Sequence, residues 1–201
     1  MSRGAAHAGA CFVAGTPVHA KHGLVPIEQL RAGDLVLTRR RTDDAPSYTR
    51  IETPIRHRDA RVLLVTLFPD GEADQRALVC TDTTCLLQDG AHGFIRVDDP
   101  EMFQGPVLAT LVGEFAIAWG ARRVLKTETP GLGWTYFDDQ DYFGPTIDLR
   151  DGQVVVSDIR ADSQPDDALE DDLTTIAYEI ELPEGEFCFV GEQGLCVAGG
   201  L

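Results

Sequence analysis

Cys11 is the side chain of this sequence that is best placed for chemistry. It stands at the start of a predicted strand, and Gly15 and Pro17 shape a turn soon after it. A thiol in this position can be held against the carbonyl group of the preceding residue, Ala10. The thiolate is the nucleophilic form of cysteine, so a sulfur held there has an electrophile within reach. The alternative is a small buried side chain that begins a strand, the usual role of a free cysteine.

The length and charge of the chain limit what it can be. Its 201 residues suit one sizeable domain, or one domain with an elaborate insertion. The net charge of −16 comes from 33 acidic and 17 basic residues and repels both a phosphate backbone and an anionic membrane surface. We therefore expect neither nucleic acid nor a membrane as a partner, and solubility is the simpler interpretation of the acidity.

The five cysteines are odd in number and include no CxxC pair. This pattern is typical neither of a disulfide framework nor of a zinc site, so we expect reduced thiols, no metal and no cofactor. No apolar run approaches the roughly 20 residues of a membrane helix. Residues 1–10 also lack the apolar centre of a signal peptide.

Short β-branched runs between turn residues predict an all-β fold, because helical periodicity of any length is absent. A helical turn fits at Pro26–Leu30, before Gly33 and Asp34 start the next strand. The runs predicted to be strands are Leu35–Thr38, Val62–Leu67, Ala77–Cys80, Val154–Val156, Thr175–Glu181 and Phe187–Val190.

Two segments of the second half differ from these runs. Residues 112–160 are rich in aromatic side chains, which predicts a packed sub-structure. Three aspartates among them fit a solvated turn better than a calcium loop, because the spaced acidic pattern with a glycine and a distal glutamate is lacking. Residues 161–174 are acidic and poor in large apolar groups, so we expect a mobile loop there. The aromatic residues are Trp119, Trp134, Tyr136, Phe137, Tyr142 and Phe143, and the aspartates are Asp138, Asp139 and Asp141.

The stretch that begins at Cys11 reads CFVAGTPVHAKHGLVPIEQLRAGDLVLTRR. It resembles the opening block of Hint domains, the all-β autoprocessing modules of inteins and hedgehog proteins, and in particular those of bacterial polymorphic toxins. The shared features are the cysteine, a small-residue turn, a hairpin, a Pro-Ile-Glu turn and a Gly-Asp strand start. In that family the thiolate attacks the preceding carbonyl carbon and converts the amide into a thioester. The bond concerned here is Ala10–Cys11.

A second block, ALVCTDTTCLLQDG, resembles the family strand that carries Thr-x-x-His. Thr81 occupies the threonine position and Thr84 the histidine position. In the family the hydroxyl stabilises the strained amide and the imidazole protonates its nitrogen. A threonine hydroxyl cannot supply that proton at neutral pH, and losing a general acid costs on the order of 100- to 10,000-fold in rate. The resemblance thus implies an impaired reaction unless another group substitutes. The candidates are Cys80, Cys85, His19, His22 and His57, each of which also fits a purely structural role.

The third block, TTIAYEIELPEGEFCFVGEQGLCVAGGL, resembles the closing strands of the family, which end in His-Asn. Ala198 and Gly199 stand at those two positions. In the family the asparagine cyclises and cuts the downstream bond while the histidine assists. Neither alanine nor glycine has an amide to cyclise, so C-terminal cleavage and splicing are expected to be absent. The residues that match are Tyr178, Ile180, Phe189, Val190, Gly191, Gly194 and Val197.

The resemblance implies an all-β, Hint-type horseshoe of pseudo-two-fold β-hairpins with an inserted aromatic-rich segment. Its first and last strands are expected to lie side by side. We predict an N-terminal flanking segment at 1–10, a Hint domain at 11–198 with the insertion at about 112–174, and a C-terminal tail at 199–201.

Two functions are consistent with this resemblance. In the first, Cys11 forms a thioester with Ala10, Thr81 assists at the amide, and water or an added thiol releases the upstream segment. In the second, the chain is a catalytically inactive Hint scaffold that serves as a binding or spacer module in a toxin-related protein. The partners expected are the upstream and downstream segments of a parent polypeptide, and a protein partner for the scaffold. We expect a cytoplasmic location on synthesis and export only as part of a larger toxin-type protein.

Overall fold

Strands make up nearly all of the regular secondary structure in the computed structural model, in agreement with the predicted all-β class. The structure describes residues 10–40, 44–69, 76–88, 93–111, 114–137, 142–157, 168–183 and 185–198, with the backbone alone for 69, 114–119, 142 and 168. These ranges contain no α-helix, and within them no helix is long and apolar enough to cross a bilayer. The two 3-10 turns are η1 (Ile27–Gln29), inside the predicted helical turn, and η2 (Pro100–Gln104).

One sheet has eight strands in the order β3-β2-β4-β17-β18-β8-β9. Strand β5 pairs with β4 at its side, and β2 also pairs with β17. The strands are β2 (Pro17–Ala20), β3 (Gly23–Pro26), β4 (Leu35–Arg39), β5 (Ser47–Arg50), β8 (Cys85–Leu87), β9 (Phe94–Arg96), β17 (Phe187–Val190) and β18 (Leu195–Ala198).

The other sheet has ten strands in the order β14-β13-β12-β11-β6-β16-β1-β7, with β10 and β15 paired to β11. The strands are β1 (Cys11–Val13), β6 (Ile55–Pro69), β7 (Arg76–Thr81), β10 (Val107–Ala109), β11 (Glu114–Thr127), β12 (Leu132–Phe137), β13 (Tyr142–Asp148), β14 (Val155–Ser157), β15 (Ala168–Asp172) and β16 (Thr174–Glu179). Each of the six predicted strands overlaps one observed strand, namely β4, β6, β7, β14, β16 or β17, although Val154, Ile180 and Glu181 lie outside the strands.

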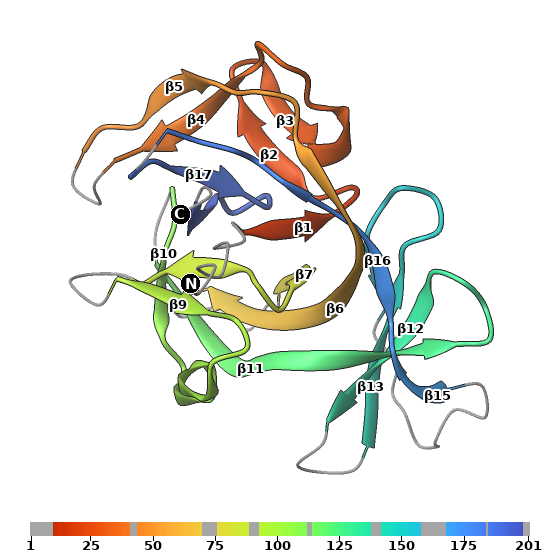
Figure 1. The fold of residues 1–201 in the computed structure, drawn as a ribbon. Coiled ribbons are helices and arrows are strands. Elements are labelled where there is room, and N and C mark those ends of the chain that lie inside the picture. The colour runs from red at the N-terminus through yellow and green to blue at the C-terminus, as the bar shows by residue number, and fades with distance from the viewer. Residues whose placement is uncertain are drawn as a thin grey trace, which may run out of the picture.

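Four strands of the ten-stranded sheet form a closed circuit of pairings that includes β1. The long β6 pairs with β16 through residues 55–61 and with β7 through residues 62–67. Both β16 and β7 pair in turn with β1. Figure 1 shows the long, curved β6 with β1, β7 and β16 beside it. Because β1 is hydrogen bonded on both sides, its register is fixed by two ladders at once.

The first and last strands, β1 and β18, are not neighbours in a sheet, and the expectation that they lie side by side is wrong in that respect. Strand β1 pairs with β16 and β7, whereas β18 pairs with β17 and β8. The two strands nevertheless contribute to one hydrophobic cluster, which contains Ala10 and Phe12 together with Leu195 and Val197. The two ends of the fold therefore share one hydrophobic core.

The aromatic segment forms the strands β11 to β14, and in Figure 1 β12 and β13 project away from the region around β1. The predicted packing is confirmed for its described aromatic rings. Phe143 contacts Trp134 with the ring centroids 6.4 Å apart and Tyr136 with the centroids 5.2 Å apart. The side chains of Trp119 and Tyr142, and the aspartates of the predicted solvated turn, lie outside the described residues: Asp138, Asp139 and Asp141.

The mobile loop predicted at 161–174 is wrong for its second half. Residues 168–172 form β15, which pairs with β11, and β16 begins at Thr174. Basic side chains of β11 bind the acidic ones of β15: Arg123 to Asp172 at 2.8 Å and Lys126 to Asp171 at 2.6 Å. Residues 161–167 lie outside the described part of the chain.

Candidate active site

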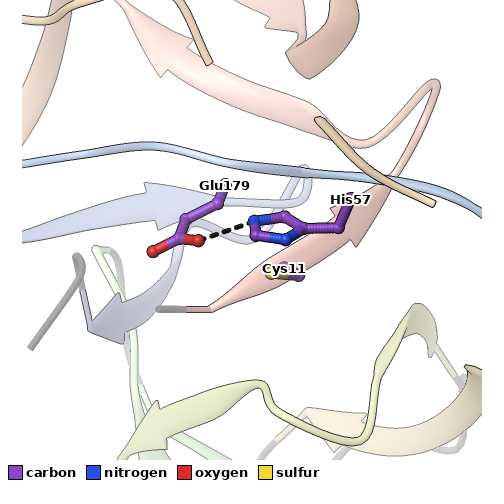
Figure 2. Close-up of side chains that lie close together, drawn as sticks. All are labelled: Cys11, His57 and Glu179. Atoms are coloured by element: carbon purple, nitrogen blue, oxygen red, sulfur yellow. Dashed lines mark hydrogen bonds and ion pairs between the residues drawn. The ribbon is translucent and has the colours of Figure 1, made fainter. Parts of the chain in front are cut away.

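The sheet register brings three reactive side chains to one place. Cys11, the first residue of β1, lies opposite Glu179 on β16. Two residues earlier on the same face of β16, Ala177 lies opposite His57 on β6. The sulfur of Cys11, one imidazole nitrogen of His57 and one carboxylate oxygen of Glu179 lie within 4.8 Å of one another. Figure 2 shows the imidazole with the carboxylate and the thiol next to it.

A hydrogen bond orients the imidazole. Nε2 of His57 lies 2.7 Å from Oε2 of Glu179, and because a carboxylate accepts, the imidazole donates. In a neutral ring this leaves Nδ1 without a proton and able to accept one. The side chain of Glu179 is 9% exposed and that of His57 is 37% exposed. A thiol, an imidazole and a carboxylate in this relation are a nucleophile, a base and the group that orients the base.

The thiol of Cys11 is protonated at neutral pH. Its pKa is raised to about 11, mainly by burial and also by the negative charges of Glu179 and Asp82, while a hydrogen bond with the Thr83 side chain partly offsets this rise. Cys11 itself is 3% exposed. Since the thiolate is the reactive form, a neighbouring base has to remove the proton during any reaction.

Thr81 and Thr84, the two predicted site residues of the second block, both bind the backbone of Cys11. The hydroxyl of Thr84 donates to the carbonyl oxygen of Cys11 at 2.8 Å, and that of Thr81 donates to the same oxygen at 3.3 Å. This oxygen belongs to the peptide bond after Cys11, one residue beyond the carbonyl of Ala10. Both hydroxyl groups therefore hold the backbone of Cys11 in place.

The turn after β1 is stabilised by the Pro-Ile-Glu segment of the opening block. The side chain of Glu28 accepts a hydrogen bond from the backbone N–H of Gly15 at 2.8 Å. The backbone N–H of Ile27 donates to the carbonyl oxygen of Thr16 at 2.9 Å. Two parts of the sequence motif that lie more than ten residues apart thus fix the chain just beyond Cys11.

At the C-terminal end, Ala198 is the last residue of β18, is buried and lies opposite Phe187. Its methyl side chain offers no acid, base or amide. Gly199, the other predicted position of this end, lies outside the described residues.

Among the described histidines, His57 is the one that joins Cys11 in this cluster. Nε2 of His19 lies 3.0 Å from the carbonyl oxygen of Gly191, and His22 is exposed on the β2–β3 hairpin. Burial raises the pKa of Cys80 to about 12. The pKa of Cys85 is also raised, again mainly by burial.

Sequence reasoning missed Glu179. It occupies an unspecified position of the third block, between Tyr178 and Ile180, so the motif gives it no weight. Strand alternation does place it on the same face as Ala177. Its meeting with Cys11 and His57 depends on the register of three strands, which the sequence does not specify.

Comparisons with known proteins agree with this architecture. Residues 10–103 match the family model of the Hint domain. No curated protein matches the chain. Among solved structures, the solution structure of a bacterial intein-like domain from Clostridium thermocellum has a TM-score of 0.55 at 16% identity, over 94% of this chain and 98% of that one.

Two further structures are similar over almost their whole length. The Ssp DnaB mini-intein variant M86 has a TM-score of 0.54 at 9% identity, over 96% of each chain. The TvoVMA intein has a TM-score of 0.50 at 10% identity, over 94% of this chain and 97% of that one. The chain therefore has the Hint/intein fold, as its three motif blocks predicted.

Proposed function

We propose that this chain is an intein-like autoprocessing domain that cleaves itself on the N-terminal side of Cys11. In this reaction the sulfur of Cys11 attacks the carbonyl carbon of Ala10, and the Ala10–Cys11 amide becomes a thioester. The observation that carries the proposal is the convergence of Cys11, His57 and Glu179 at the first residue of a Hint fold. Ala10 is itself buried beside them, so the bond to be cleaved lies in a shielded place.

The proton transfers of this reaction fit the cluster. His57 takes the thiol proton while the S–C bond forms and negative charge develops on the oxygen of Ala10. The imidazolium then gives that proton to the nitrogen of Cys11 as the C–N bond breaks. Glu179 accepts the hydrogen bond from Nε2 throughout and stabilises the imidazolium. His57 thereby takes the role that histidine has at the Thr84 position in the family.

Thr81 and Thr84 act as positioning residues in this proposal. They hold the carbonyl oxygen of Cys11, so that the nitrogen and the sulfur of the same residue have little freedom. Water or an external thiol then attacks the thioester and releases the upstream segment. Ala198 and Gly199 provide no side-chain amide for a second cleavage, so the reaction ends there without splicing.

The test is a fusion with a reporter protein placed upstream of Ala10. Incubation with dithiothreitol or hydroxylamine releases the reporter from the wild type and leaves Cys11→Ala intact. His57→Gln slows release by about 100-fold or more, the usual contribution of a general base. His22→Gln is the matched control, since this exposed histidine lies outside the cluster, and it releases at the wild-type rate.

The second candidate function is a catalytically inactive Hint scaffold that serves as a binding or spacer module in a toxin-related protein. The raised pKa of Cys11 and the methyl side chain at Ala198 favour it. The same fusion separates the two functions. Absence of thiol-induced release over several days, in a folded wild-type protein, refutes autoprocessing and leaves the scaffold.

A further inference from the structure

We propose that a second site of this chain binds an extended peptide of alternating basic and apolar residues, which adds as a strand to the free edge of β7. The site is a cleft between residues 145–156, at the end of the aromatic segment, and the strands β6 and β7. It shares no residue with the cluster of Cys11, His57 and Glu179, so it does not depend on the proposed function.

Most of the outer edge of β7 is unpaired in the part of the chain that the structure describes. Strand β7 pairs with β6 along all of its 6 residues, whereas β1 meets its other side at Cys80 alone. In an antiparallel sheet the backbone N–H and C=O groups of successive residues point to opposite sides of the strand. About half of the backbone groups of residues 76–79 therefore point away from β6, toward no described strand.

A cleft keeps this edge accessible. It is open to solvent and has a volume of about 810 Å³, within the range of about 300–1,000 Å³ that is usual for ligand sites. Residues 76–79 of β7 form one wall. The opposite wall contains Val154 and Val156, which lie at β14, the strand at the other end of the same sheet.

The floor of the cleft is apolar. One hydrophobic cluster extends from Val79 on β7 and Leu64 on β6 to Ile147 on β13, and Val156 packs against it. Leu64 lies opposite Val79, and Val156 lies opposite Ile147, so the side chains of each pair share a face of the sheet. A strand added to β7 directs every second side chain to this floor, which favours small apolar residues such as valine.

A tight backbone contact closes one end of the cleft. A Cβ built on Gly15 would lie 2.9 Å from the Cα of Gln153 and 2.9 Å from the carbonyl oxygen of Gly152. The turn after β1 and the segment before β14 therefore touch, which fixes the distance between the two walls. A site that is already formed loses little free energy to ordering when a ligand binds.

The charges around the cleft favour a basic peptide. Its lining residues include three carboxylates, on Glu28, Asp151 and Glu192, and one guanidinium, on Arg76. Glu28 already accepts a hydrogen bond from Gly15, whereas Asp151 and Glu192 are exposed. Lysine or arginine side chains that point out of the cleft lie beside these two carboxylates. A second copy of this chain is disfavoured as the occupant, because it has the same net charge of −16.

The probe is a seven-residue synthetic peptide of alternating lysine and valine, blocked at both ends and labelled with a dye. Its affinity for the full chain carrying Cys11→Ala, in which self-cleavage cannot interfere, is measured by fluorescence anisotropy. The same peptide with glutamate in place of lysine is expected to bind at least about 10-fold more weakly. No binding of the lysine peptide, or equal affinities for the two peptides, refutes the proposal.

Methylation of the peptide backbone tests strand addition. Two further lysine–valine peptides have methyl groups on the backbone nitrogens of either the odd-numbered or the even-numbered residues. A methylated nitrogen cannot donate, and one of the two sets of N–H groups faces β7 in an added strand. One methylated peptide is therefore expected to lose at least about 10-fold in affinity. Strand addition is excluded if both bind as tightly as the unmethylated peptide.

A charge-neutralising variant tests the position of the site. Asp151→Asn combined with Glu192→Gln is expected to weaken binding of the lysine peptide by about 3- to 10-fold. Glu52→Gln combined with Glu101→Gln is the matched control, because these two glutamates are exposed and lie outside the cleft. An equal loss in both double variants would mean that the net charge of the chain, not the cleft, attracts the peptide.

Backbone amide exchange locates the peptide without any change in the cleft. At least one amide of residues 76–79 is expected to exchange fast in the free chain and slowly with the peptide bound. If all four exchange slowly in the free chain, another segment of this chain or a second copy already fills the edge, and the proposal is overturned. Loss of that protection on dilution identifies the second copy.

Discussion

At the scale of single residues, the proposed nucleophile is unreactive by itself. Cys11 is buried and its pKa is about 11, so nearly all of it is in the thiol form at neutral pH. Two neighbouring groups can offset this low reactivity of the thiol. His57 lies close enough to Cys11 to take the thiol proton in the proposed reaction, and Glu179 fixes the orientation of His57. The chemistry expected at Cys11 therefore depends on its neighbours more than on the cysteine itself.

Thr84 offers the sharpest test at this scale, because the family has histidine at its position. Thr84→His is expected to raise thiol-induced reporter release by up to about 100-fold, since a second imidazole would lie beside the Ala10–Cys11 bond. The rate of release at fixed dithiothreitol measures this. Thr84 is completely buried, so thermal unfolding of the variant has to be recorded alongside, and overpacking is expected to cost about 1–3 kcal/mol.

A folded Thr84→His variant that releases more slowly than the wild type would contradict the alignment of the second block. Thr84→Val is the matched control, since it keeps the shape and removes the hydroxyl that binds the carbonyl oxygen of Cys11. It is expected to be slower than the wild type.

At the scale of elements, the turn between β1 and β2 determines where Cys11 points. Gly15 has a φ of +86°, and a Cβ built on it would lie 2.9 Å from the Cα of Gln153. Its backbone N–H also donates a hydrogen bond to the side chain of Glu28. The residue must therefore have no side chain, for conformational and for steric reasons.

Gly15→Ala is accordingly expected to destabilise the fold by about 2–4 kcal/mol, from the positive φ and from the backbone contact together. Urea unfolding followed by circular dichroism measures the change. Gly23→Ala is the matched control for the contact: its φ is also positive, at +115°, but its Cβ would meet no atom within 4 Å. A Gly15→Ala variant no less stable than Gly23→Ala would show that the close approach to residue 153 does not hold.

At the scale of the whole molecule, four described thiols are almost completely buried. Burial raises the pKa of Cys80 and of Cys188 to about 12, that of Cys11 to about 11, and that of Cys196 above its ordinary range as well. In the unfolded chain these groups ionise near pH 9. Their contribution to stability is therefore complete below pH 9 and is lost as the pH rises toward 12.

The free energy of unfolding is thus expected to fall from pH 9 upward, by about 1 kcal/mol for each deeply buried thiol at pH 10. Urea unfolding between pH 8 and pH 10.5 measures the slope. Cys188→Ala is expected to have a shallower slope, whatever its stability at pH 8, because one ionising group is gone. The same slope in this variant and in the wild type would mean that other groups cause the loss.

The sequence predicts the positions of the strands better than their partners. Short β-branched runs between turn residues were enough to find β4, β6, β7, β14, β16 and β17, and the motif blocks identified the Hint fold. The acidic strand β15 was missed because its composition was judged alone, whereas Arg123 and Lys126 of β11 neutralise its aspartates. The pairing of the end strands was also wrong, since the chain joins its ends through a common core.

Only part of the candidate site was predicted, because the sequence shows where strands lie better than which strands pair. Cys11 was identified because a motif surrounds it, and Thr81 and Thr84 because a second motif does. His57 was one of five candidates and Glu179 was missed. Their relation to Cys11 arises from cross-strand register between segments far apart in the chain, and no local pattern contains that information.

The circuit of β1, β6, β7 and β16 has a consequence for the timing of the reaction during protein synthesis. The first strand has its full set of partners only after residues 174–179 have left the ribosome. At about 5–20 residues per second, the cysteine emerges several seconds or more before the carboxylate that completes its surroundings. Under the proposed function, an upstream segment stays covalently attached during this interval and is released only after translation of the last strands.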